Sequence, residues 1–136
     1  MRRPFLALPL VVAALAGGCT AQNSSSGDFE GAQQDVADVI DRLGSAGETG
    51  DGAEICGELL AKPLADRMAA GGSTCAQQLE DALGDADDFD LSVESVEVDG
   101  TRATARVTGA DGERDRAYTF ELERTGDDWR ITSLGA

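Results

Sequence analysis

The most distinctive chemistry in this chain belongs to its three cysteines, Cys19, Cys56 and Cys75, because the 136 residues include no histidine. The missing imidazole excludes Ser-His-Asp and Cys-His nucleophilic systems, histidine-liganded zinc and a histidine pH switch. The thiols therefore remain as candidates for acylation, disulfide formation, redox chemistry or metal binding. The sequence around each cysteine distinguishes between these kinds of chemistry.

Cys19 follows a segment with the order of an export signal. Arg2 and Arg3 form a positive start, residues 5–16 are apolar, and two glycines follow, as in a secretory signal peptide. The apolar run is too short to span the roughly 30 Å hydrocarbon core of a bilayer. We therefore expect residues 1–18 to be a signal peptide that is removed on export.

The residues directly before Cys19 resemble the lipobox of bacterial lipoproteins. They read Leu15-Ala16-Gly17-Gly18-Cys19, and in that family the cysteine thiol receives diacylglycerol before cleavage. The resemblance implies a membrane anchor of fatty acyl chains such as palmitate, in which each buried CH₂ contributes about 0.8 kcal/mol. The alternative is an ordinary secreted protein in which Cys19 is a stray thiol.

Cys56 and Cys75 would then lie outside the reducing cytosol, where two cysteines of a small domain are expected to form a disulfide. Closing a loop of about twenty residues would contribute about 3 kcal/mol. A redox pair is the alternative, but such pairs usually have Cys-x-x-Cys spacing. Two cysteines without histidine also make a poor metal site. Of the three cysteines, Cys19 is then the one left for lipid.

The chain is strongly acidic, with 26 acidic and 11 basic residues and a net charge of −15. Cleavage after residue 18 would remove two arginines and no acidic residue, which takes the charge to −17. Such a surface disfavours nucleic acid and anionic headgroups as partners. The cluster Asp85, Asp87, Asp88 and Asp90 lacks the glycine that a calcium loop requires. We interpret it as a solvated connection and expect neither metal nor cofactor.

The length of the chain allows one domain. Residues 19–27 are small, polar and without charge, which is the composition of a flexible tether. We therefore assign residues 28–136 to a single domain.

Helical periodicity marks the first half of that domain. Apolar residues recur every three or four positions over 28–43, which predicts a helix with Asp28 as N-cap and Gly44 as its stop. A glycine-rich loop is expected over 45–52.

Shorter helices should follow this loop. The pattern predicts a helix over 53–61 and a turn of helix over 63–70 that begins with proline. A third helix would end at Leu83, capped by Ser73 or by Thr74, whose spacing to Gln77 fits a capping box.

The second half of the domain alternates apolar and polar residues with period two. Strands are predicted over 89–98, 101–109, 116–124 and 129–134. Helices followed by strands indicate an α+β domain in which three N-terminal helices pack on a curled four-stranded antiparallel meander.

The first hairpin is expected to turn at Asp99-Gly100. That turn would pair Glu97 with Arg102. The apolar positions of the first strand change phase at Glu94-Ser95, which predicts a β-bulge there.

Matching the apolar faces sets the remaining register. Val107 should lie opposite Tyr118, and Leu122 opposite Ile131. The outer face would then carry a row of alternating charges, made of Glu97, Arg102, Glu123 and Arg130. We interpret this row as solvent-exposed ion pairs rather than as an active site.

Three aromatic residues, Tyr118, Phe120 and Trp129, fall on the inner face of the predicted sheet. Core packing is the favoured interpretation of this group. A ligand pocket lined by the same side chains is the alternative.

The segment from Asp28 onward resembles the nuclear transport factor 2-like superfamily, whose domain is a cystatin-like cone of helices against a curled antiparallel sheet. The resemblance rests on the three helices, on the bulged strand 89–98, on the segment Thr101 to Val107 and on the closing segment 126–134, with Trp129 two residues before isoleucine. Enzymes of that family isomerise or dehydrate small molecules with an Asp or His base in the cavity. This chain has no histidine, and the register places no aspartate on an interior strand position.

These observations favour a membrane-anchored extracytoplasmic lipoprotein with a non-catalytic binding or accessory role in the cell envelope. Its expected partners are the membrane, through lipid on Cys19, and a protein of the envelope, but not nucleic acid. The alternative is a small-molecule binder, or an isomerase- or dehydratase-like enzyme, that uses the cavity of the cone.

Overall fold

The computed structural model describes residues 26–69, 71–85, 89–111 and 114–135. The predicted signal peptide, Cys19 and most of the tether lie outside these residues, as do Ala70, Asp87 and Asp88. Within the described part, no helix is long and apolar enough to cross a bilayer.

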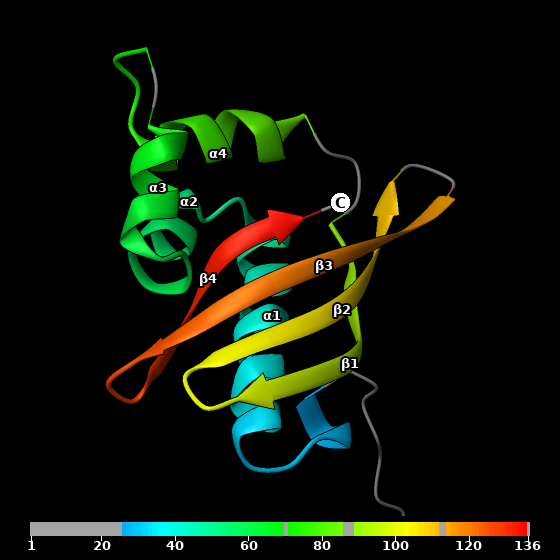
Figure 1. The fold of residues 1–136 in the computed structure, drawn as a ribbon. Helices are drawn as coiled ribbons and strands as arrows, with labels where there is room; N and C mark the ends of the chain where they lie inside the picture. Colours follow the sequence, from blue (N-terminus) through cyan, green and yellow to red (C-terminus); the bar gives the residue numbers. More distant parts are fainter. Residues whose placement is uncertain (1–25, 70, 86–88, 112–113, 136) are drawn as a thin grey trace, which may run out of the picture.

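The architecture is α+β, with helices first and an antiparallel sheet last (Figure 1). The helices are α1 (Ala32–Thr49), α2 (Gly52–Glu54), α3 (Lys62–Met68) and α4 (Cys75–Gly84), with a 3-10 turn η1 (Ser26–Asp28) and a π-helical segment η2 (Ile55–Leu59). The strands are β1 (Leu91–Asp99), β2 (Arg102–Asp111), β3 (Arg114–Thr125) and β4 (Asp128–Gly135), hydrogen-bonded in the order β1-β2-β3-β4. The sheet is open. Helix α1 crosses its inner face, while α2, α3 and α4 gather at one end (Figure 1).

Helix α1 packs one apolar face against the sheet. Its buried residues recur at the three- and four-residue spacing of a helix with one inward face; they are Val36, Ala37, Val39, Ile40, Leu43, Gly44, Ala46 and Gly47. The helix ends where Gly50 takes a left-handed conformation (φ 70°) and donates its N–H to the last carbonyl groups.

The boundaries predicted for this helix, residues 28–43, are wrong at both ends. Asp28 lies in the preceding 3-10 turn, and Gly31 is the N-cap residue. The helix continues through Gly44, and most of the predicted loop is helical as far as Thr49.

Close packing explains why the glycines do not end the helix. A Cβ atom on Gly47 would overlap the ring of Phe89, and one on Gly44 would lie 3.8 Å from Cβ of Leu91. The missing side chains therefore let α1 approach the sheet, a use of glycine that helix periodicity does not distinguish from a stop signal.

The shorter helices follow the predicted order. The helix expected over 53–61 is divided into α2 and η2, and Pro63 lies in the first turn of α3. The capping box of α4 is confirmed. The hydroxyl of Thr74 accepts from the N–H of Gln77 at 3.2 Å, and the Gln77 side chain accepts from the N–H of Thr74 at 3.0 Å.

The predicted bulge in β1 is confirmed. Val93 pairs with Val107 and Ser95 with Arg106, so Glu94 is the extra residue. The bulge explains why the apolar positions of β1 change parity without leaving the inner face.

The register predicted for the first hairpin is wrong by two residues. Arg102 pairs with Asp99 instead of Glu97, because the turn consists of Gly100, at φ 61°, and Thr101. A shift of two residues leaves every side chain on its own face of the sheet, so the inner face was assigned correctly despite the error.

The other two hairpins have the predicted register where their apolar residues meet. Val107 pairs with Tyr118, and Leu122 pairs with Ile131. A second bulge, at Thr132 in β4, was not predicted.

The row of alternating charges is present, but one of its four residues differs from the prediction. Arg102 pairs with Glu123 and Glu123 with Arg130, but the β1 member is Asp99 instead of Glu97. The row is therefore displaced by the same two residues as the hairpin, and its residues lie on the outer face.

Candidate functional site

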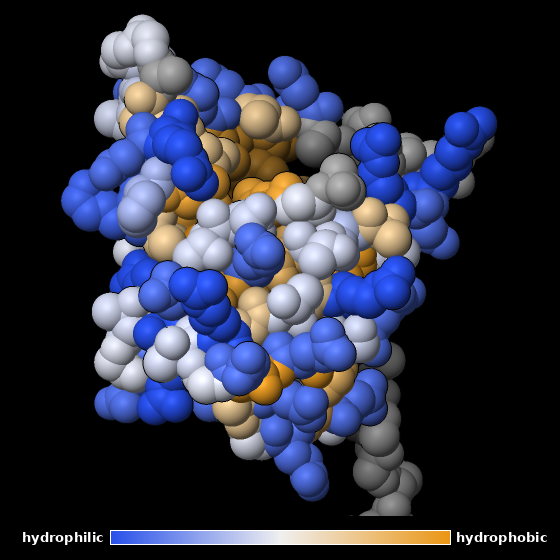
Figure 2. Space-filling model, in the orientation of Figure 1, coloured by the Kyte–Doolittle hydropathy of each residue, from blue (hydrophilic) through white to orange (hydrophobic). Residues whose placement is uncertain are grey.

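An open pocket lies between the short helices and the inner face of the sheet. Figure 2 shows it as an orange hollow at the end of the molecule where α3 and α4 stand. Its volume is about 260 Å³, and its walls are almost entirely apolar. The residues that line it are Leu43, Ile55, Leu60, Met68, Leu79, Leu83, Phe89, Asp90, Leu91, Gly109, Ala110, Tyr118, Phe120 and Leu134.

The helical wall is held by a disulfide. Cys56 of η2 and Cys75 of α4 are joined with an S–S distance of 2.03 Å and a Cα–Cα distance of 6.1 Å, the pairing expected for these two cysteines. Ile55, next to Cys56, and Leu79, one turn after Cys75, both line the pocket. The cross-link therefore fixes the spacing of two elements that form one side of the cavity.

The opposite wall is formed by β1, β2 and β3, and a glycine keeps it open. A Cβ atom on Gly109 would lie 3.1 Å from both Cδ2 of Leu91 and Cε2 of Tyr118. Glycine thus leaves room for the tyrosine ring, whose centroid is 6.2 Å from that of Phe120 in a tilted arrangement. Together with Phe89, these rings make the sheet side of the pocket aromatic.

Polar groups are scarce in this site. Asp90 is the one charged residue of the lining, and its side chain is exposed. Tyr118 contributes the one phenol. Across the described residues there are no buried polar or charged side chains, and no group of three or more potential metal ligands occurs among them. The arrangement is suited to holding an apolar molecule by burial.

Leu134 is exposed at the protein surface. It is 41% exposed, and no other large hydrophobic residue in the described part of the chain is exposed to that extent. Because Leu134 also lines the pocket, a bound molecule would cover apolar surface that now faces water.

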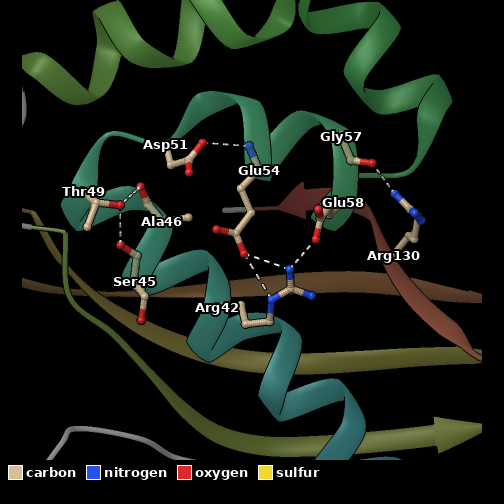
Figure 3. Close-up of polar contacts among 9 residues, drawn as sticks. All are labelled: Arg42, Ser45, Ala46, Thr49, Asp51, Glu54, Gly57, Glu58 and Arg130. Atoms are coloured by element: carbon tan, nitrogen blue, oxygen red, sulfur yellow. Dashed lines mark hydrogen bonds and ion pairs between the residues drawn. The ribbon is translucent and has the colours of Figure 1, made fainter.

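A second, polar hollow lies between α1, η2 and the β3–β4 hairpin, and Figure 3 shows the ion pairs of Arg42, which lines it. Arg42 of α1 donates to Glu54 at 2.8 Å and to Glu58 at 2.7 Å, while Arg130 donates to the carbonyl oxygen of Gly57 at 2.8 Å. Hydrogen bonds to Glu58 and Glu54 raise the pKa of the Arg42 guanidinium, which stays protonated. These contacts tie α1 and β4 to the α2–η2 segment, a structural role.

The sequence placed Tyr118, Phe120 and Trp129 on the inner face and favoured core packing for all three. Phe120 and Trp129 are buried, 5% and 4% exposed. Tyr118 is half-buried and lines the pocket together with Phe120, so core packing describes only part of the group. The signal for a cavity was Gly109 at an inward position of the alternating strand β2, diagonally opposite Tyr118 on the neighbouring strand.

The predicted covalent sites have different outcomes. Cys56 and Cys75 are brought together, and Cys19 lies outside the described residues.

No protein-family model matches the chain, and no curated protein matches it either. The site must therefore be interpreted from its own geometry.

Proposed function

We propose that this chain is a lipid-anchored extracytoplasmic protein with a non-catalytic binding role in the cell envelope, and that the apolar pocket is its binding site. The observation that carries the proposal is the open pocket of about 260 Å³ with a lining of apolar and aromatic side chains. Burial of apolar surface contributes roughly 25 cal/mol per Å² to the free energy of binding. An apolar molecule that fills the pocket is therefore bound without a chemical reaction.

The proposed location, anchored to the membrane in the cell envelope, is supported by the sequence and by the pairing of the cysteines. The disulfide uses Cys56 and Cys75, which leaves Cys19 as the odd cysteine. Its position after a signal-like segment supports lipidation, with the membrane as first partner and a protein of the envelope as a further one. The net charge of −15 argues against nucleic acid as a partner.

We also propose that the domain is a member of the nuclear transport factor 2-like superfamily. The support is the order of helices before a curled four-stranded meander and the bulge at Glu94. A cavity between the helices and the inner face of the sheet is the place where the cone of that family would hold a small molecule.

The alternative of an isomerase or dehydratase has weaker support. Such an enzyme needs a base inside the cavity, held away from water so that its basicity is tuned. The carboxylate of the described lining, on Asp90, is exposed. The proposal therefore stops at binding.

The binding part is tested with N-phenyl-1-naphthylamine, a small apolar dye that fluoresces when it leaves water. The exported chain carrying Cys19→Ser should enhance the fluorescence of the dye. Leu83→Trp should abolish this enhancement, because Leu83 is a half-buried residue of α4 and the larger side chain fills the pocket. Leu64→Trp is the matched control and should bind as the parent does, because Leu64 is a half-buried residue of α3 outside the pocket lining. Equal enhancement by all three proteins would contradict the proposal.

The anchor is tested separately in cells. Radiolabelled palmitate should label the full chain, and the label should disappear in Cys19→Ser. Retention of label in that variant would refute the lipobox interpretation, while leaving the pocket proposal to its own test.

A further inference from the structure

We infer that the pocket selects apolar ligands that carry a negative charge at one end, as a fatty acid carries a carboxylate, and that Arg116 contacts this charge. The inference rests on the proposed function, since it concerns the ligand of the same pocket. It follows from the side chains that the strand register places on the inner and the outer face of the sheet beside the pocket.

The carboxylate of Asp90 is on the outer face, although Asp90 belongs to the pocket lining. Phe89 and Leu91, on either side of it, pack inward against the core, and successive side chains of an extended strand point to opposite faces. Asp90 contributes its backbone, whose carbonyl oxygen accepts from the N–H of Ala110 at 3.3 Å. No other charged residue is among the described lining residues, so none of them directs a charge into the pocket.

Arg116 is the next inward residue of β3 beyond the pocket. Tyr118 and Phe120 line the pocket, and Arg116 lies two residues before Tyr118, so its side chain is on the same face. Arg116 pairs with Gly109 of β2, and Cα atoms paired in this way are about 4.5–5.5 Å apart. Because Gly109 is itself part of the lining, the pairing places Arg116 at the edge of the pocket.

This position suits a ligand whose charged end stays in water. Arg116 is exposed and outside the lining, whereas Tyr118 is half-buried within it. A ligand with its body among the apolar side chains can therefore bring its end to Arg116 without the cost of burying a charge. A guanidinium binds a carboxylate through two parallel hydrogen bonds, and the phenol of Tyr118 can donate another.

Two features oppose this preference and limit its size. The net charge of −15 lowers the concentration of anions near the surface, although salt at moderate ionic strength screens this effect beyond roughly 10 Å. Arg116 also engages in an interaction of its own, which a ligand carboxylate has to share or displace. We therefore expect a preference of about threefold, which is within the range of a solvent-exposed ion pair.

The size of the pocket limits the body of the ligand. Its volume of about 260 Å³ lies just below the range of roughly 300–1,000 Å³ found for ligand pockets. A short hydrocarbon chain is therefore a suitable probe, and octanoate, octan-1-ol and octylamine provide one body with negative, neutral and positive ends.

The test is a titration of the exported Cys19→Ser chain with each probe at neutral pH and moderate ionic strength, followed through the amide NMR signals of Gly109 and Ala110. Octanoate should bind about threefold more tightly than octan-1-ol. Octylamine should bind most weakly, because Arg116 repels its ammonium group.

Two matched variants locate the charge that is responsible. Arg116→Gln should bring the affinity for octanoate down to that for octan-1-ol or below it, with the affinity for the alcohol unchanged. Arg106→Gln is the control, because Arg106 is exposed between the buried residues Ala105 and Val107 and therefore faces outward. This variant removes the same charge from the other face, so the order of the three probes should remain.

The outcomes separate the inference from the function on which it rests. Equal binding of octanoate and octan-1-ol by the parent chain, or tightest binding of octylamine, would overturn the inference. So would equal losses of octanoate affinity in Arg116→Gln and Arg106→Gln, which would assign the preference to total charge. In these cases the pocket would still bind, so the proposed function would stand. No binding of any probe, or equal binding by Leu83→Trp, would overturn the proposed function itself.

Discussion

The inner face of the sheet is covered in two different ways along its length. Over one region α1 lies directly on the strands, and residues such as Ile40, Leu122 and Ile131 are at most 2% exposed. Over the other region the short helices reach the sheet at β4, where Ala61 donates its N–H to the carbonyl oxygen of Ile131 at 2.8 Å. They leave the pocket open over the neighbouring strands, and Leu79, Leu83 and Met68 are only half-buried around it.

The strands alternate inward and outward residues in both regions, and Gly109 is the strand position whose missing side chain adds room at the pocket. The covering elements account for the rest of the difference. Gly44 and Gly47 let α1 approach the sheet closely, and the side chain of Gln33 donates to the carbonyl oxygen of Val96 at 2.9 Å. The short helices are instead held to each other by the disulfide. One region is thus built for packing density and the other for a stable gap.

The largest expected effect compares a truncation in each region. Ile40→Ala should lower the free energy of unfolding by about 4 kcal/mol, because a fully buried side chain leaves a cavity. Leu83→Ala should lower it by about 1 kcal/mol, because its site is already open. Urea unfolding followed by the fluorescence of Trp129, the only tryptophan, measures both. If Ile40→Ala does not fold, Ile40→Val should still lose about 1 kcal/mol. Equal losses at the two sites would remove the distinction between the regions.

The next effect concerns the cross-link of the open region. Replacing Cys56 and Cys75 together with serine should lower the free energy of unfolding by about 3 kcal/mol, because the bond closes a loop with a sequence separation of 19 residues. The parent chain unfolded with and without reductant is the control and should show the same difference. A loss below about 1 kcal/mol would mean that the pocket wall holds its shape without the bond.

A smaller effect tests the close approach of α1. Gly47→Ala should lower the free energy of unfolding by about 2 kcal/mol, because the added methyl overlaps the ring of Phe89 and overpacking has costs of that size. Gly57→Ala is the matched control in the open region. No atom lies within 4 Å of its Cβ position, so alanine there should be neutral or stabilise by up to about 1 kcal/mol. Similar values for both variants would contradict the packing argument.

The same two regions show what sequence reasoning can reach. The inner face of the sheet was predictable because a period of two survives even a register error of two residues, as at Asp99 and Arg102. The bulge at Glu94 was predictable because it corrects a change of phase that is visible in the sequence. The disulfide was predictable because the chain offers few cysteines for it.

The extent of α1 and the openness of the pocket were not predictable in this way. Glycine ends a helix at Gly50 and allows close packing at Gly47, and only the partner across the interface distinguishes the two uses. The distance between the short helices and the sheet likewise depends on side chains from separate elements. Periodicity reports which face is buried and does not report how completely it is filled.

The smallest expected effect concerns the ion pairs that connect the two regions. Arg42 is in α1, and its partners Glu54 and Glu58 are in the segment leading to the disulfide (Figure 3). Arg42→Gln should lower the free energy of unfolding by less than about 1 kcal/mol, because its side chain is 48% exposed and solvent screens such pairs. The loss should shrink in 1 M salt.

The pH dependence of this contribution has a definite sign. Its partners raise the pKa of Arg42 above the ordinary value, so the stabilisation is complete below that ordinary value and is lost only as the pH rises through the higher pKa of the folded state. The difference between Arg42→Gln and the parent should therefore receive no pH dependence from Arg42 itself between about pH 6 and 9. Lys62→Gln is the matched control, because Lys62 pairs with Asp66 inside one helix and joins no two elements. A larger loss for Lys62→Gln than for Arg42→Gln would show that the connection between α1 and the α2–η2 segment adds nothing to an ordinary surface pair.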